Sequence, residues 1–239
     1  MTAASPARQF SSGAKILIPP RTRQEVFLAK PTNNQYTVEV EPGASLLLVL
    51  SSLPSVFNLQ ASVAQDSSLT VVVAFKTKAA TKFFSYIRLV GRGAKVKEQT
   101  ALVASQGAEI YVENVFEHLA PQTFGRVVSR RVQADNSAGE FWGLLKVSPQ
   151  ATGTDTYLSD KALLIGDKAR ATSVPKLEIL TDEVKASHGT AVGKLSPEEL
   201  FYLQSRGLDR LAAEKLLTTA FLEPALAGLS PRLRGLIGY

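Results

Sequence analysis

The first 195 residues alternate short apolar runs with clusters of turn-forming residues. Each run is rich in β-branched or aromatic residues and is bounded by Gly, Ser, Asn or Asp, a pattern that predicts β-strands rather than helices. The predicted strands are Tyr36–Val40, Leu46–Leu50, Leu69–Phe75, Phe83–Val90, Val96–Val103, Glu109–Val115, Gly125–Val132, Phe141–Val147, Ala162–Ile165 and Lys176–Leu180. This part of the chain is therefore expected to be mainly β.

Several of the runs begin with the same local pattern, in which small residues precede an apolar residue. The pattern occurs at 43–46, 67–69, 93–96 and 107–110, and its second small residue recurs at intervals of 24, 26 and 14 residues. Intervals near one or two multiples of about a dozen residues are typical of stacked coils. The pattern favours a β-helix, although a β-sandwich also has short strands at similar spacing. Strict hexapeptide repeats, which would indicate a left-handed helix, are absent.

The pattern changes to that of helices at Leu195. Ser196 and Pro197 form a helix start, with Glu199 in place for a capping box, and the first helix is expected over 198–206 before Gly207. A second helix is expected over 209–222, and Ser230-Pro231 begins a third short turn. The predicted organisation is an N-terminal extension over 1–35, a β-helix core over 36–195 and a helical segment over 196–239.

Composition and charge restrict the classes of function. The 239 residues include no Cys, which excludes disulfides, cysteine nucleophiles and Cys-held clusters from this chain alone. The net charge of +6 permits a polyanionic partner without requiring one. No apolar run is long enough for a signal peptide or a membrane span, so we expect a soluble, cytoplasmic protein.

Two histidines are candidates for chemistry. His188 lies in the segment Ala186–Gly189, and a neutral imidazole is a good iron ligand, but a lone His there is also consistent with a turn residue beside a flexible Gly189. His118 follows Glu113 and Glu117, which at strand spacing could bind a metal, although charged residues on a solvated strand face are the commoner explanation.

Other motifs argue against catalysis and nucleic-acid binding. The chain has no G-x-S-x-G and no P-loop sequence, so neither a hydrolase elbow nor direct nucleotide binding is expected. A basic stretch from Lys76 to Lys97 is interleaved with Phe83, Phe84 and Tyr86, which could form a nucleic-acid groove. Strand alternation favours a simpler arrangement, with Phe84 and Tyr86 inside and the basic side chains in solvent.

The segment from Phe141 to Phe221 resembles the core of the SufB/SufD family, which belongs to the SUF iron–sulfur assembly system. The resemblance rests on phrases in a specific order: FWGLLKV at 141–147, TDTY at 154–157, LLIGDKA at 163–169, PKLEI at 175–179, DEVKASHGTAVG at 182–193 and ELFYLQSRG at 199–207. The phrase around His188 is closer to SufD than to SufB. Family members are usually longer and have a helical N-terminal region.

The resemblance implies a right-handed parallel β-helix followed by a helical hairpin at the C-terminus. It implies a non-catalytic scaffold that pairs with a SufB-like subunit or an identical chain. It also implies that the segment 196–239 docks a SufC-like ATPase, and that this ATPase supplies the ATP-dependent step. His188 would be a ligand to a transient iron–sulfur cluster at the subunit interface, and Ala186 stands where many relatives have Cys. The residues expected to bind partners are Phe201, Leu203, Arg206, Leu217 and Phe221.

Two other functions are compatible with the sequence. One is a homodimeric SufC-binding module without cluster chemistry, which the missing cysteines favour. The other is a β-helix enzyme that acts on acidic polysaccharide, which the basic stretch would assist. The sequence does not distinguish a homodimer from a heterodimer, because a two-fold contact needs only a self-complementary patch.

Overall fold

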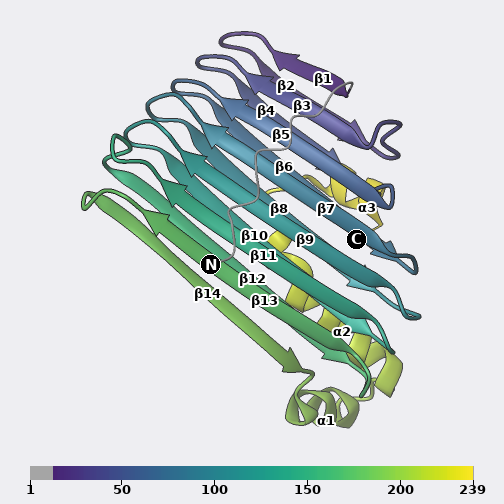
Figure 1. Cartoon of the computed structure of the whole chain (residues 1–239). Coiled ribbons are helices and arrows are strands. Elements are labelled where there is room, and N and C mark those ends of the chain that lie inside the picture. The colour runs from purple at the N-terminus through teal and green to yellow at the C-terminus, as the bar shows by residue number, and fades with distance from the viewer. Residues whose placement is uncertain (1–12, 239) are drawn as a thin grey trace.

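The chain folds as a parallel β-solenoid with helices at its C-terminus. The structure is a computed structural model that describes residues 13–238. Alternate strands fall into two seven-stranded parallel sheets, which we call the odd sheet and the even sheet (Figure 1). The odd sheet contains β1 (Ala14–Ile18), β3 (Gln35–Val40), β5 (Val56–Val63), β7 (Thr81–Leu89), β9 (Glu109–His118), β11 (Ala138–Val147) and β13 (Arg170–Ile179). The even sheet contains β2 (Arg23–Leu28), β4 (Ser45–Leu50), β6 (Ser68–Thr77), β8 (Lys95–Ala104), β10 (Phe124–Ala134), β12 (Thr154–Ile165) and β14 (Val184–Lys194).

This topology confirms the predicted β-helix and excludes the β-sandwich, whose sheets are antiparallel. One coil consists of an odd strand and the even strand that follows it, and each strand pairs in parallel with the strand two positions later. Strands β1 and β2 lie within the segment 1–35 that the sequence set apart as an extension, and residues 1–12 of that segment lie outside the described residues.

The small residues at the predicted corners have the expected structural role. Gly43 and Gly93 both have φ of 70°, a left-handed conformation that favours glycine. Ala44 and Ala94 follow them and are fully buried. A larger side chain would not fit at these two buried positions, so the pairs Gly43-Ala44 and Gly93-Ala94 mark points where the chain enters the even sheet, whereas Gly107-Ala108 precede β9 of the odd sheet.

The solenoid interior forms the main hydrophobic core. Inward-facing side chains stack from coil to coil, as in the row of Tyr36, Phe57 and Phe83, whose neighbouring ring centroids are 5.5 and 6.2 Å apart. Each coil therefore buries the apolar surface that the previous coil leaves open.

The predicted orientation of the aromatic residues in β7 is wrong. Phe83, Ser85 and Ile87 are buried inside, whereas Phe84 and Tyr86 lie on the outer face of the odd sheet and are half-buried. Both faces of this strand carry apolar residues, so the sequence alone does not determine which set of alternating side chains points into the solenoid.

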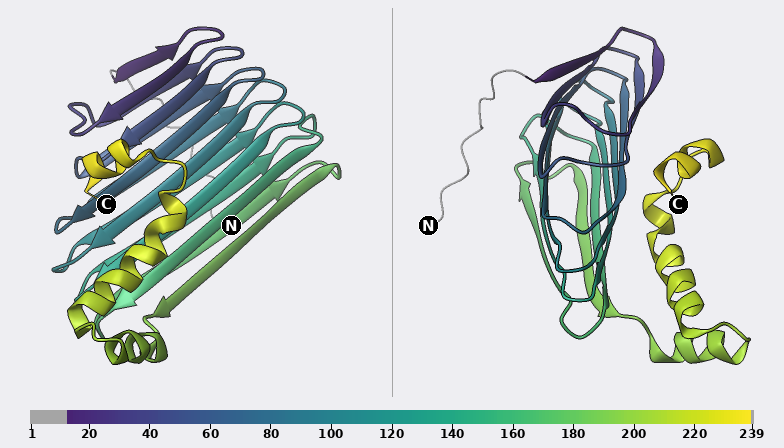
Figure 2. Two further views of the ribbon diagram at one scale, coloured as in Figure 1. Left: turned by 180° about the vertical axis from the view of Figure 1, so that it is seen from behind. Right: turned by 90° about the vertical axis from the view of Figure 1, so that its right-hand side faces the viewer.

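The helical segment contains α1 (Pro197–Ser205), α2 (Arg210–Leu222), a 3₁₀ turn η1 (Glu223–Ala225) and α3 (Pro231–Ile237). The predicted start of α1 is confirmed, because Ser196 Oγ accepts a hydrogen bond from the Glu199 N–H at 3.2 Å. The chain then crosses the outer face of the even sheet (Figure 2). The odd sheet has no helix over it in this view.

The end of α2, η1 and α3 form what we call the C-terminal clamp, residues 221–237. Its apolar residues Leu222, Leu226 and Leu233 pack on outward-facing residues of the even sheet such as Val72 and Ala101. Gln99 of β8 also donates a hydrogen bond from Nε2 to the Ala227 carbonyl at 3.1 Å. The clamp thus forms a second hydrophobic core outside the solenoid.

Candidate functional site

His188 is exposed on the last strand of the even sheet. It lies within β14 and not in a turn, so the interpretation as a turn residue is wrong. Its register partner on β12 is Leu158, which is fully buried in the solenoid core. Partners in a parallel ladder present their side chains on the same face, so His188 continues an inward-facing row. It is exposed because no described strand follows β14 on that edge.

Gly189 does not form the sharp turn that the sequence suggested. It lies inside β14 and its φ is not in the left-handed region. A Cβ at this position would come within 2.8 Å of the Tyr157 hydroxyl on the neighbouring strand. The glycine next to His188 therefore provides room for Tyr157 rather than conformational freedom.

Strands β13 and β14 form an open end of the solenoid. Each pairs on one side only among the described residues, so each presents an edge of backbone N–H and C=O groups. Apolar side chains at this end are also exposed, with Leu177 36%, Val192 45% and Leu180 60% exposed. His188 is thus placed at an edge with both free backbone groups and apolar surface.

The helices α1 and α2 carry a second set of exposed apolar side chains. The largest exposed side chains on it are Phe201 and Leu211, at 74% and 77%, accompanied by Tyr202 and Leu216. Of these, only Phe201 had been singled out as a partner-binding residue. The other three could have been predicted because the apolar residues of the two helices cover more than the single face that packs on a neighbour. We call these four residues the helical apolar surface.

The other predicted partner-binding residues have different surroundings. Leu203 and Leu217 are half-buried, and Phe221 packs against the core of the C-terminal clamp. The exposed Arg206 places its guanidinium carbon 5.3 Å from the centroid of the Tyr202 ring, within the range of a cation–π contact. No contact in this structure tests whether these residues bind a partner.

His118 does not share a metal site with Glu113 and Glu117. The histidine points into the solenoid and is fully buried, whereas the two glutamates lie on the outer face of the same strand. Its ring nitrogens hydrogen-bond to the hydroxyls of Thr123 at 2.8 Å and Thr156 at 3.1 Å. Burial lowers the pKa of His118 to about 4, so the ring is neutral at pH 7.

The structure contains no ready metal centre within the residues it describes. No group of three or more metal-binding His, Asp or Glu side chains occurs in residues 13–238. Among these residues His188 therefore has no companion ligands that would complete a metal site within the chain.

Glu98 is a buried carboxyl group inside the solenoid, two residues from Thr100 on the same inward face. Ser85 Oγ donates to its Oε2 at 2.5 Å, and the Asn114 side-chain amide donates to its Oε1. Burial raises the pKa of Glu98 to about 7, although both hydrogen bonds act in the opposite direction. The sequence around Glu98 does not indicate this burial, because its context is that of an ordinary charged strand residue.

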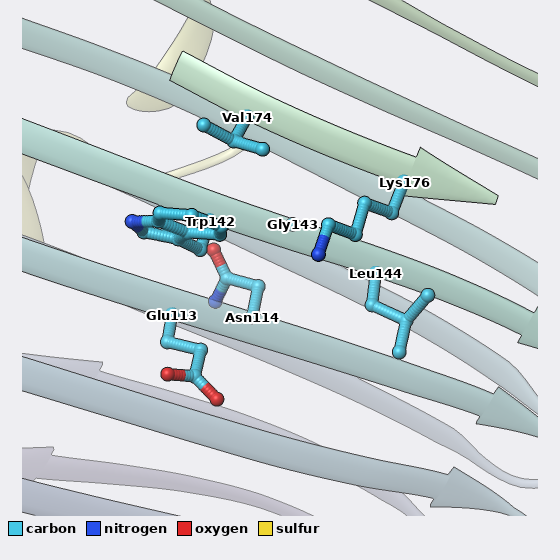
Figure 3. Close-up of a pocket in the computed structure, with 7 residues that line it drawn as sticks. All are labelled: Glu113, Asn114, Trp142, Gly143, Leu144, Val174 and Lys176. Atoms are coloured by element: carbon cyan, nitrogen blue, oxygen red, sulfur yellow. The ribbon is translucent and has the colours of Figure 1, made fainter. Parts of the chain in front are cut away.

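A shallow pocket lies on the outer face of the odd sheet, over β9, β11 and β13 (Figure 3). The Trp142 indole and the Lys176 ammonium lie on one side of it, with Nζ 5.3 Å from the ring centroid, and Glu113 lies on the other. Glu113 accepts a hydrogen bond from the Tyr111 hydroxyl at 2.9 Å. Lys176 thus contacts the Trp142 ring and Glu113 contacts Tyr111, so these charges already have partners and the pocket indicates no particular ligand.

The basic stretch and its own aromatic residues do not line one groove. Lys82 and Arg88 lie on the outer face of the odd sheet, whereas Lys95 and Lys97 lie on the outer face of the even sheet. Phe83 is buried in the interior. Successive basic residues of this stretch are thus divided between two opposite faces of the solenoid.

Comparisons with known proteins place the chain in a family. The SUF system FeS cluster assembly SufBD core domain matches residues 32–221. A SufBD family protein of Mycobacterium bovis is 31% identical over 183 residues, which are 73% of this chain and 46% of that protein. SufD of Escherichia coli is 36% identical over 40% of this chain and 23% of its own length. SufB of Bacillus subtilis is 29% identical over 57% of this chain and 29% of its own.

The chain spans less than half the length of the relatives it matches. The matches include both SufD and SufB, so they give only a weak preference for the SufD-like type. No helix in residues 13–238 is long and apolar enough to cross a membrane. Because the family domain covers both the solenoid from β3 onward and the helices α1 and α2, this chain belongs to the SufBD family of the SUF iron–sulfur cluster assembly system.

Proposed function

We propose that the chain is a non-catalytic scaffold subunit of a cytoplasmic SUF-type complex. In this proposal the helical apolar surface docks a SufC-like ATPase, and the open end of the solenoid pairs with a SufB-like subunit or a second copy of the chain. The observation that carries the proposal is the presence of two separate exposed apolar surfaces in a member of the SufBD family. ATP would act through the SufC-like partner.

The helical apolar surface has the composition of a protein-binding patch. Phe201 and Leu211 are large apolar side chains that are about three-quarters exposed, and aromatic anchors of this kind dominate many protein interfaces. The C-terminal clamp holds the far end of α2 against the even sheet, so the docking surface sits on a fixed support. A partner bound there would contact the solenoid indirectly through the helices.

The docking proposal is tested with the double variant Phe201→Ser/Leu211→Ser. We expect it to lose binding to SufC in a pull-down while its thermal midpoint stays close to that of the wild type, since neither side chain is buried. Leu236→Ser on α3, which is 51% exposed, is the matched control and should bind normally. Unchanged SufC affinity of the double variant would refute this docking surface. Point variants are preferable to deleting 196–239, which would uncover the apolar outer face of the even sheet.

Pairing through the open end follows from its exposed strand edges. An unpaired edge can accept a strand from another chain through main-chain hydrogen bonds, and Val192 and Leu177 would add apolar contact. Val192→Lys should abolish co-elution with a SufB-like subunit, or dimerisation of the chain alone, in size-exclusion chromatography with light scattering. Leu17→Lys at the opposite end of the solenoid is the control. Loss of pairing in the control alone would place the interface at the other end.

His188 is proposed as a nitrogen ligand that faces a cysteine of the partner across this interface. Its exposed imidazole at the open edge supports this role, and the cluster is cargo held jointly by both subunits. His188→Ala should change the free energy of unfolding by no more than about 0.5 kcal/mol, as expected for an exposed site. In a reconstituted complex the same variant should lose most of the cluster yield. Unchanged yield would exclude the ligand role.

A homodimeric SufC-binding module without cluster chemistry is the second candidate, and the absence of Cys from the chain favours it. The two candidates differ in cluster assembly. A chain that dimerises alone, does not bind a SufB-like subunit, binds SufC and gives no cluster in the reconstituted complex would support the second candidate.

A further inference from the structure

The solenoid interior changes from apolar to polar along its length. The inward-facing residues of β6 include Val71, Val73 and Phe75, all in the hydrophobic core. On β8 the register partners of Val71 and Val73 are Glu98 and Thr100, and both are fully buried. Buried polar residues continue along β10 and β12. The interior of the later coils is thus built from different chemistry from that of the first coils.

An ion pair lies in the middle of this polar region. Arg131 on β10 donates from Nε to Asp160 Oδ1 at 3.0 Å and from Nη2 to Oδ2 at 2.7 Å, and both side chains are fully buried. Nη2 also donates to the Thr172 carbonyl at 3.1 Å. The carboxylate and guanidinium neutralise each other, so the pair adds no net charge to the interior.

Several buried polar atoms around the pair have no hydrogen-bond partner within residues 13–238. They are Thr100 Oγ1, Ser129 Oγ, Arg131 Nη1, Gln133 Nε2 and Ser173 Oγ. Thr100 and Ser129 are neighbours across the β8–β10 pairing, and Arg131 and Gln133 follow two and four residues later on β10. Ser129 is the register partner of both Thr100 and Asp160 on the neighbouring strands. Buried polar groups in native proteins almost always have partners, so these unpaired atoms indicate bound species in the interior of the later coils.

Arg131 Nη1 and Gln133 Nε2 also converge on one point. They lie 2.9 and 2.2 Å from the position that a Cβ on Gly139 would occupy. Two N–H donors therefore reach the same small region beside β11, where the missing side chain of Gly139 makes room for the Gln133 amide. Hydroxyl groups of Ser129 and Thr100 lie on the same inward face of the neighbouring strands, and these can either donate or accept.

We propose that the interior of the later coils holds bound water molecules that hydrogen-bond to Arg131 and Gln133 beside Gly139 and to Ser129 and Thr100 across the β8–β10 pairing. A water molecule can accept two hydrogen bonds and donate two, so it can satisfy both N–H donors and hydroxyl groups. A small anion would also accept from Arg131, but it would add an unpaired charge to a region where Asp160 already neutralises the arginine. Neutral water is therefore the favoured ligand. This inference does not depend on the proposed function.

Water magnetic relaxation dispersion on the full chain tests the proposal, because it counts water molecules held for longer than the tumbling time of the protein. We expect at least one such water in the wild type. The variant Thr100→Val/Ser129→Ala removes two bridging hydroxyls with little change of volume and should lose at least one long-lived water. Ser67→Ala is the matched control, since this buried serine already donates to the Ala64 carbonyl at 2.6 Å.

Two results would overturn the proposal. The first is a wild type without long-lived water, or a dispersion amplitude that is equal in the wild type and the double variant. The second is saturable binding of bromide. It would be seen as a rise in the thermal midpoint of the wild type that is absent in the double variant. This result would assign the site to an anion. If the double variant does not fold, Ser129→Ala alone gives the same comparison.

Discussion

Replacing Glu98 by Gln should stabilise the protein at neutral and alkaline pH. Glu98 is fully buried and its pKa is raised to about 7 by burial, whereas in the unfolded chain it is near 4.5. The folded state thus retains a proton that the unfolded state has released between these two values. The contribution of Glu98 to the free energy of unfolding is fully present below pH 4.5 and is lost as the pH rises to about 7. Gln has the shape of the neutral acid and cannot ionise.

The size of the effect follows from the pKa difference. One pKa unit corresponds to 1.36 kcal/mol, so the rise from 4.5 to about 7 corresponds to about 3 kcal/mol at pH 8. For a chain of this size, such a difference is about 6 to 12 °C in Tm. At pH 4.5 the two proteins should have similar stability, because Glu98 is protonated in the folded state and still about half protonated in the unfolded chain.

His118 makes the experiment sharper because it acts in the opposite direction. Its pKa falls from 6.5 to about 4 on folding, so its contribution is complete above pH 6.5 and is lost as the pH falls towards 4. Between pH 4.5 and 6.5 the two groups offset each other in the wild type. In Glu98→Gln only the histidine remains, and stability should rise with pH by about 3 kcal/mol across this window.

The assay is urea unfolding of wild type and Glu98→Gln at half-unit steps from pH 4.5 to 8, followed by fluorescence of Trp142. The m value should be the same in both proteins, which would show that only stability has changed. A Glu98→Gln variant that is less stable than the wild type at pH 8 would refute the reasoning. It would mean that the ionised carboxylate is the form that Ser85 and Asn114 stabilise.

Three further substitutions test other parts of the structure. His118→Asn should remove the loss of stability below pH 6.5, and a pH titration of the unfolding free energy that keeps this slope would contradict the assignment to His118. Arg131→Met should lower the free energy of unfolding in urea by about 3 to 5 kcal/mol, because it leaves Asp160 charged and unpaired. A decrease below about 1 kcal/mol would show that Asp160 finds another partner. Gly143→Ala should cost about 1 to 3 kcal/mol, because its Cβ would lie 2.2 Å from the Leu158 side chain; an unchanged urea midpoint would show that Leu158 can move aside.

Local sequence signals were sufficient to predict most of the architecture. The pairs Gly43-Ala44 and Gly93-Ala94 marked coil corners because tight turns and small buried residues are required at the same places. Ser196 and Gly207 marked the limits of the first helix, and Gly207 has the expected positive φ of 93°. These predictions succeeded because each depends on one or two adjacent residues.

The strand β14 and the buried polar residues were harder to predict. β14 contains Lys185, Ser187 and His188 and few large apolar residues, since an exposed edge strand does not need a continuous apolar face. Glu98 and Arg131 resemble solvent-facing residues in sequence, and their burial follows from the pairing of strands that lie one coil apart. Local propensity contains no information on such distant contacts.

The C-terminal clamp imposes an order on folding. Gln99 binds the carbonyl groups of Pro224 and Ala227, which are 125 and 128 residues away in sequence, whereas the coils of the solenoid pair with their immediate neighbours in the stack. Closing a long loop costs entropy before its contacts form. The coils can therefore add one by one as the chain leaves the ribosome, while the clamp forms only after β4 to β12 are in place. Until then the outer face of the even sheet remains an exposed apolar surface, and the nascent chain is most prone to aggregate in that interval.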